Sequence, residues 1–326
     1  MDIFALLMWP IKWVIEAILI GFHTLVVALG GDPASGLTWV LSIVGLVLVI
    51  RSAMIPLTVR QIVSSRKSLE IQPEIQRIQK KYKGKKDQFS REAMQRETME
   101  AYRKAGTNPF ASCLPLLIQM PIFLGLVQVL TDSNNRRAGV TAPIGFLTEQ
   151  RAIEFSESTL FGVVPLHQTM QGGFATGDVA VIVTAIVLTA IMCATQFYTQ
   201  LQIMTKNQTP AMKESPMYKQ QRILLYIIPV FLLISAWLFP LGTMFYWLVS
   251  NIYTLVQQLI IINKMPTPGS DAALAREARM ARKRQRMGLP PVEGEEAAAE
   301  AELEIRTQRQ QPRSKRTKSQ REGGNA

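Results

Sequence analysis

An arginine lies within an apolar segment that is long enough to cross a membrane. Residues 37–59 read LTWVLSIVGLVLVIRSAMIPLTV, with Arg51 near the carboxyl end and Pro56 about one turn later. A spanning helix needs about 20 residues, and an arginine at membrane depth costs roughly 2.5–3.5 kcal/mol on insertion scales. Such a charge persists where it meets water, a counter-charge or carbonyl groups. Arg51 therefore indicates a hydrated site that attracts negative charge, unless its long side chain reaches the headgroups instead.

Uncharged polar residues recur in the other apolar segments. Gln119 lies in the second segment, and Gln196 lies near the end of the third. In the last segment a polar set recurs at about helical spacing and shares one face, so it faces protein or water rather than lipid. This set is Ser250, Asn251, Thr254, Gln257 and Gln258. An ordinary role for such groups is hydrogen bonding between helices, worth about 0.6–2 kcal/mol each.

The sequence lacks the motifs of common catalytic and metal sites. It contains no HExxH, GxSxG or P-loop pattern, and His23 and His167 are isolated. Cys113 and Cys193 both lie in apolar segments, which is typical of packing residues rather than of a disulfide framework. We therefore expect no enzyme, no metal, no cofactor and no small-molecule substrate. A small-solute transporter is the alternative, but coupled transporters usually carry a carboxylate at membrane depth.

The distribution of charge predicts how the elements around Arg51 are arranged. The chain has 326 residues, 48% of them hydrophobic, and a formal net charge of +12. Its apolar residues occur in blocks of about twenty with the charge between and after them, which is typical of a multi-pass membrane protein. We predict an all-α fold with a five-helix core over residues 37–263. The predicted spans are residues 37–59, 109–130, 179–200, 223–239 and 243–263.

The segment between the first two spans, residues 60–107, is strongly basic. Apolar residues recur at helical spacing on both sides of Lys83-Gly84-Lys85-Lys86, which predicts a helical hairpin; a solvated charged loop is the alternative. Basic segments lie on the cytoplasmic side of a membrane. With five spans, this rule places the N-terminus outside and the C-terminus in the cytoplasm.

The N-terminal residues 1–30 have a mixed character. Lys12, Glu16 and His23 share one helical face, and Trp9 lies near the start. This pattern predicts an amphipathic helix in the membrane interface, with its tryptophans at headgroup level. An additional membrane span is the alternative.

The C-terminal residues 264–326 alternate between basic and acidic runs. Apolar residues are too sparse there to form a core, so we expect a mostly disordered cytoplasmic tail. Its basic runs would attract RNA or anionic lipid. The alternative is that they only orient the chain and keep it soluble.

Five strings of the sequence, in a fixed order, are similar to those of a known family. They are IRSAMIPLT (50–58), QPEIQRIQKKY (72–82), NPFASCLPLLIQMPIFLGL (108–126), IIPVF (227–231) and LFPLGTMFYWLVSNIYTLVQQ (238–258). The similarity extends over roughly residues 9–262. The chain resembles the YidC/Alb3/Oxa family of membrane protein insertases, in the short form without a large extracytoplasmic domain.

The resemblance implies a five-helix core around a hydrophilic groove that is open to cytoplasm and lipid and closed on the outside. Arg51 matches the arginine of the groove, and Tyr246 matches a tyrosine along the substrate path. Trp247 stands where another tyrosine is common, and Val47 replaces a frequent hydroxyl residue, so the groove is expected to be less polar here. The predicted groove residues are Arg51, Gln119, Gln196, Tyr246, Trp247, Asn251 and Thr254.

The resemblance also implies a function. We expect the chain to insert nascent membrane proteins into a bacterial plasma membrane and to help them fold, alone or with the Sec translocon. Acting only as a Sec-dependent folding chaperone is the alternative. The hairpin and the basic tail are similar to segments that recruit the ribosome or the signal recognition particle system. The candidate recruitment residues are Lys80, Lys81, Lys83, Lys85 and Lys86.

Overall fold

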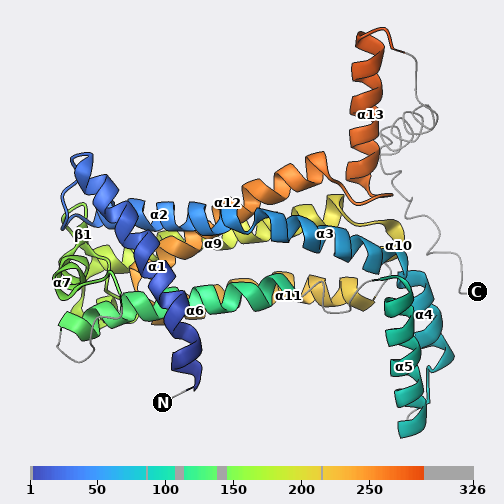
Figure 1. Ribbon diagram of the computed structural model, residues 1–326, viewed down its shortest axis with the longest axis horizontal. Helices are drawn as coiled ribbons and strands as arrows, with labels where there is room; N and C mark the ends of the chain where they lie inside the picture. The colour runs from blue at the N-terminus through green and yellow to red at the C-terminus, as the bar shows by residue number, and fades with distance from the viewer. Residues whose placement is uncertain (1–2, 86, 107–113, 138–144, 214–215, 290–326) are drawn as a thin grey trace, which may run out of the picture. The chain divides into compact units, whose positions relative to one another are not determined.

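The computed structural model describes residues 3–85, 87–106, 114–137, 145–213 and 216–289 (Figure 1). In this part of the chain most residues are helical, which confirms the predicted all-α class. The chain divides into two compact units. The larger unit takes in the described residues within 1–204 and 211–259, and the smaller one takes in residues 205–210 and 260–289.

Within the described part of the chain, five helices are long and apolar enough to cross a membrane. They are α1 (Ile3–Ala28), α2 (Gly36–Ala53), α9 (Val179–Lys206), α11 (Pro216–Leu238) and α12 (Leu241–Lys264). The last four overlap four of the predicted spans. The predicted span 109–130 corresponds to α6 (Leu114–Arg137), whose described apolar part is Leu117–Thr131; residues 107–113 lie outside the described part of the chain.

The first predicted span consists of two helices rather than the single one expected over residues 37–59. α2 ends at Ala53, and α3 (Ile55–Glu70) begins after Met54. Pro56 has no N–H to donate and its ring crowds the preceding turn, which breaks the regular helix. The Met54 amide still donates to the Ile50 carbonyl at 3.1 Å, and the Thr58 amide donates to the Met54 carbonyl at 2.9 Å. The break therefore leaves the neighbouring hydrogen bonds in place.

The N-terminal helix α1 lies across α2 and α6 rather than alongside them (Figure 1). A side chain at Gly45 of α2 would clash with the ring of Phe22, and a Cβ at Gly125 of α6 would lie 2.9 Å from Ile15 Cδ1. Both helices thus carry a glycine where α1 crosses them. The crosswise placement suits a helix in the membrane plane, whereas its length also suits a span, so the interfacial placement stays a prediction.

The polar face of α1 points into the protein. Lys12, Glu16 and His23 are 8%, 0% and 2% exposed, whereas Trp9 and Trp13 are 52% and 41% exposed. An ordinary interfacial helix turns its polar face to water. Here that face is covered by the protein, and α1 presents an apolar, tryptophan-bearing face to its surroundings.

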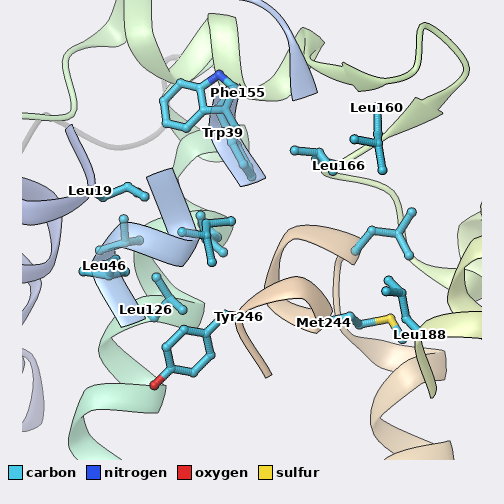
Figure 2. Close-up of a cluster of buried hydrophobic side chains, with 14 of the residues drawn as sticks. Leu19, Trp39, Leu46, Leu126, Phe155, Leu160, Leu166, Leu188, Met244 and Tyr246 are labelled. Atoms are coloured by element: carbon cyan, nitrogen blue, oxygen red, sulfur yellow. The ribbon is translucent and has the colours of Figure 1, made fainter. Parts of the chain in front are cut away.

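The segment between α6 and α9 forms a cap over the ends of the spans. It contains α7 (Glu149–Glu157), the strands β1 (Thr159–Leu160) and β2 (Val164–Pro165), and α8 (Met170–Thr176). Phe155 of α7 is 1% exposed and packs its ring edge against Trp39 at 5.2 Å between centroids (Figure 2).

The strand pair is attached to the first residues of α2. Ser35, the N-cap of α2, forms a bridge with Thr159, and a Cβ at Gly36 would lie 2.6 Å from the Leu160 nitrogen. The turn between the strands holds Phe161 at φ 54° and Gly162 at φ 75°. Left-handed backbone costs a residue with a side chain roughly 1–2 kcal/mol. Phe161 alone among the described non-glycine residues has a positive φ.

Two helices form a hairpin after α3. α4 (Gln72–Lys81) and α5 (Gln88–Lys104) pack together through Ile75 and Ala101, which are 5% and 3% exposed. Lys81 Nζ and the Tyr82 hydroxyl both donate to Glu97 Oε1, at 2.6 and 2.8 Å.

In the smaller unit, α13 (Asp271–Arg286) begins at the N-cap Ser270, so part of the predicted tail is helical. Residues 290–326 lie outside the described part.

The contacts at Glu97 predict how the hairpin responds to pH. Hydrogen bonds from Lys81 and Tyr82 lower the pKa of Glu97, and the bond to Glu97 raises the pKa of Lys81. The carboxylate contributes stability above its unfolded pKa of about 4.3, and that contribution is lost as pH falls through the lowered folded value. The Lys81 ammonium contributes stability below its unfolded pKa of about 10.4, and this contribution is lost as pH rises through the raised pKa of the folded state. We expect the protection of the α4 and α5 amides, measured relative to their intrinsic exchange rate at each pH, to be greatest between these limits.

The substitution Glu97→Gln removes the charge at this position and keeps an acceptor. We expect faster amide exchange in α4 and α5 at pH 7 and a flatter dependence on pH near 4, measured by mass spectrometry on the whole protein in nanodiscs. Glu100→Gln is the matched control, because Glu100 pairs with Lys104 inside α5 and does not join the two helices. Equal exchange in the two variants would contradict the role of Glu97.

Candidate functional site

Arg51 is held between two helices of the larger unit. It lies in the last turn of α2, is half-buried, and donates from Nη2 to the Ser250 hydroxyl of α12. A cation at this end of a helix is favoured by the helix dipole. The side chain thus contacts protein through Ser250, and the choice between a hydrated site and the headgroup layer stays a prediction.

The guanidinium keeps much of its capacity to bind an anion. Arginine has five N–H donors, and Ser250 receives the one hydrogen bond that Arg51 makes within the described residues. None of the ion pairs between described residues includes Arg51. The titratable side chains that interact electrostatically with Arg51 are those of Tyr246 and Tyr253, which are phenols rather than carboxylates. A negatively charged or carbonyl-bearing ligand could thus bind beside Ser250.

Tyr246 connects α12 to α6 one turn before Ser250. Its hydroxyl accepts a hydrogen bond of 2.9 Å from Gln119 Nε2, and the residue is 2% exposed. In Figure 2 the ring lies near Leu126 at the edge of the buried cluster. Because residues four apart share a helix face, α12 meets α2 through Ser250 and α6 through Tyr246 from the same side.

The other end of the Gln119 amide has no partner among the described residues. Its Oε1 atom is buried and accepts no hydrogen bond from any described residue. A buried carbonyl without a donor costs free energy comparable to a lost hydrogen bond. Water or the N–H group of a bound polypeptide would satisfy this atom, so Gln119 can act as an acceptor near the donors of Arg51.

Trp247 belongs to an aromatic cluster. Its ring stacks on Phe123 with centroids 4.7 Å apart, and it meets Phe239 and Phe231 edge-on at 5.8 and 6.1 Å. These rings come from α6, α11 and the turn before α12. The contacts give Trp247 a packing role, and its place on a substrate path stays a prediction.

The remaining predicted groove residues are less closely joined to Arg51. Gln196 of α9 and Asn251 of α12 are half-buried, and within the described part of the chain neither forms a hydrogen bond with Arg51. The Thr254 hydroxyl donates to the Ser250 carbonyl at 2.8 Å, which places it one turn further along the same face. Val47, expected beside the groove, is 1% exposed and belongs to the core.

The structure therefore brings Arg51, Ser250, Tyr246 and Gln119 into one set of contacts. Of these, Ser250 and its direct bond to Arg51 were not predicted as part of the site. The available signal was the spacing of four residues between Tyr246 and Ser250. Within the described part of the chain, no cluster of three or more His, Cys, Asp and Glu side chains could hold a metal ion.

The predicted recruitment lysines lie around the end of α4. Lys80, Lys81, Lys83 and Lys85 are exposed, and Lys86 lies outside the described residues. Two of them flank one aromatic ring, because the ammonium groups of Lys81 and Lys85 lie 5.2 and 5.5 Å from the centroid of Tyr82. Such contacts fix the position of a lysine while its charge stays accessible.

Comparison with known proteins identifies the family. The profile described as "60Kd inner membrane protein" matches residues 31–268 of this chain. The chain belongs to this family. It is 44% identical over 278 residues to a protein of Tropheryma whipplei named "Membrane protein insertase YidC", covering 83% of this chain and 88% of that relative. A protein of the same name from Bifidobacterium longum is 35% identical over 319 residues, covering 95% and 93%.

The family confirms the resemblance seen in the five sequence strings. Its members are membrane protein insertases, which is the function expected from those strings, and insertion is not a classical enzymatic reaction. Together with the long apolar helices, membership makes the chain a multi-pass plasma-membrane protein.

The contact between Gln119 and Tyr246 predicts a measurable coupling between α6 and α12. We expect the single variants Gln119→Leu and Tyr246→Phe to be non-additive, with a coupling of about 0.6–2 kcal/mol, as for other hydrogen bonds within membranes. The free energy of unfolding in detergent micelles measures it. Gln119→Leu combined with Thr254→Val is the control pair and should be additive. Additivity in the first pair would show that the bond contributes nothing.

Proposed function

We propose that this chain inserts a client protein by holding its polar segment beside Arg51 while its apolar segment moves into lipid. The half-buried guanidinium, bonded to the Ser250 hydroxyl and to no carboxylate of the described residues, is the observation that carries the proposal. A cation neutralised by a protein carboxylate would attract a client much less. A hydroxyl orients the guanidinium without cancelling its charge.

The proposed mechanism separates the two kinds of client segment. A polar segment loses hydration when it enters the membrane, and Arg51 together with the Gln119 carbonyl would replace part of it. An apolar segment gains roughly 25 cal/mol for each Å² removed from water, which drives it into lipid without nucleotide hydrolysis by this chain. The proposed groove consists of Arg51, Gln119, Gln196, Tyr246, Trp247, Asn251 and Thr254.

The proposed orientation follows the distribution of basic residues. The hairpin and the C-terminal residues lie in the cytoplasm, and the N-terminus lies outside. Release of the polar segment then proceeds outward, helped by the membrane potential when that segment is acidic.

Nascent membrane proteins are the proposed clients, delivered by the ribosome or the signal recognition particle system and shared with the Sec translocon. The exposed lysines of the hairpin support an anionic partner. So does one face of α13, where Arg276, Arg279 and Lys283 are exposed at helical spacing.

Substitution of Arg51 tests the mechanism. In proteoliposomes without the Sec translocon, we expect Arg51→Ala to slow the insertion of a client with an acidic outer segment by roughly tenfold, and Arg51→Lys to slow it less, since the charge is kept. Protease protection of the translocated segment measures the rate. The matched control is Arg60→Ala, which removes an exposed cation of α3 outside the proposed groove.

Equal slowing by Arg51→Ala and Arg60→Ala would assign the effect to net charge and remove Arg51 from the mechanism. Activity seen only when the Sec translocon is added would favour a folding chaperone that depends on Sec. Cross-links from a photoreactive residue at position 250 to the polar segment of a stalled client would support the groove directly.

A second prediction concerns recruitment. We expect the combined change of Lys80, Lys83 and Lys85 to Gln to weaken binding of ribosomes to the protein in nanodiscs, and to reduce the dependence of this binding on salt, because fewer counterions are released. Co-sedimentation over a range of salt concentrations measures both. Lys81 is kept, because it bonds to Glu97 within the hairpin. An unchanged salt dependence would contradict a role for these lysines.

A further inference from the structure

The turn between β1 and β2 presents apolar side chains outward. Phe161 is 82% exposed and Val163 is 62% exposed, although neighbouring Leu160 and Val164 are 7% and 6% exposed. The strands bury one pair of side chains in the cap and leave the turn residues without protein cover. The exposure of Phe161 is the largest among the exposed large apolar residues described.

The backbone of the turn makes phenylalanine an unexpected residue there. The Val163 amide donates to the Leu160 carbonyl at 3.2 Å, and both central residues, Phe161 and Gly162, have positive φ. Turns of this kind favour asparagine, aspartate or glycine at the first central position. Phe161 therefore gains nothing from the local fold, and strained, exposed residues of this sort often mark a functional contact.

The height of the turn relative to the membrane follows from its attachment. Thr159 bridges Ser35, which directly precedes the membrane helix α2 at Gly36. Phe161 is two residues further on, a reach of at most about 7 Å at 3.3 Å per residue. The headgroup layer on each side of the bilayer is about 5–8 Å thick. Phe161 is therefore close enough to the start of α2 to reach the headgroup layer there.

Aromatic residues elsewhere at this end of the spans support that height. Thr169 bridges Pro240, in the turn that joins α11 to α12, so the cap is attached to these spans as well. Near the end of α11, Trp237 is 41% exposed and packs against Phe174 of the cap at 5.5 Å. Exposed tryptophans are typical of the membrane–water interface.

We propose that the β1–β2 turn is a lipid anchor, in which Phe161 and Val163 insert among the headgroups of the leaflet at which α2 begins. The ligand is the bilayer interface itself. The anchor holds the cap, and with it the first turn of α2, at a fixed depth. It does not depend on the insertase mechanism, because it uses no residue of the Arg51 site.

Depth-dependent quenching tests the anchor in the full chain. With Cys113→Ser and Cys193→Ser as background, Phe161→Cys carries a small fluorescent label in nanodiscs that contain spin-labelled lipids. We expect strong quenching by lipids labelled near the headgroup and little quenching by aqueous iodide. Gln150→Cys, exposed on α7, is the control site and should show the reverse order. Iodide quenching at position 161 equal to that at position 150 would overturn the proposal.

A pair of substitutions separates anchoring from folding. Phe161→Asn places a residue favoured by the turn, so the melting temperature in detergent should stay equal or rise. In nanodiscs, amide exchange across β1 and β2 should become roughly tenfold faster, as expected when one phenylalanine is no longer removed from water. Phe161→Trp should keep the slow exchange.

Two results would exclude the anchor. Exchange in Phe161→Asn that is unchanged in nanodiscs would show that the ring has no lipid contact. Quenching that depends on a second labelled copy in the same nanodisc would show that the turn binds another copy of the chain instead of lipid.

Discussion

The contact on which the candidate site in the larger unit depends is the hydrogen bond between Arg51 and Ser250. A guanidinium at membrane depth must be solvated by something, because lipid offers no acceptor. A carboxylate would have satisfied it most strongly and would also have cancelled its charge. A serine hydroxyl satisfies one donor of five and leaves the charge, so the pairing fixes α2 against α12 and preserves attraction for a further ligand. Removing Ser250 would release the position of the guanidinium, whereas removing Arg51 would take away the charge as well.

α12 forms hydrogen bonds from one side and packs an aromatic ring from an adjacent position. One side carries Tyr246 and Ser250, which bond to α6 and α2. An adjacent position carries Trp247, whose ring is surrounded by aromatic side chains of α6, α11 and the preceding turn. The aromatic contacts hold the helix in place by packing, whereas the polar contacts are few and depend on hydrogen-bond geometry. A helix held by packing on one side can keep unsatisfied polar groups on another.

Hydropathy predicted the helical class and the places of most spans because a backbone in lipid must satisfy its own hydrogen bonds, and a helix does so locally. The contacts between helices could not be predicted in the same way. Arg51 and Ser250 are 199 residues apart, and Gln119 and Tyr246 are 127 apart, so no local pattern pairs them. The division of the first span at Met54 follows from Pro56, whose effect on a membrane helix depends on its neighbours.

The strands of the cap were missed for a different reason. Two-residue strands give no alternation to detect, and Phe-Gly is not a typical turn pair. The burial of the α1 polar face was missed because a polar stripe on an apolar helix normally predicts contact with water. On this face Glu16 Oε2 accepts a hydrogen bond of 3.2 Å from the Leu147 amide, which lies 131 residues away in the sequence.

The polar groups at the cap and those around Arg51 differ in how much hydrogen-bonding capacity they leave for a ligand. At the cap, Glu16 accepts from the Leu147 amide, His23 Nε2 lies 3.1 Å from the Pro33 carbonyl, and Arg151 donates to Thr24 at 3.1 Å. Buried polar groups that bond to one another rigidify a structure and offer little to a ligand. Around Arg51 the opposite holds, since the guanidinium has one hydrogen-bond acceptor and Gln119 Oε1 has no donor among the described residues. A polar polypeptide would therefore gain hydrogen bonds near Arg51 and would have to break them at the cap, which favours the surroundings of Arg51 as the proposed groove.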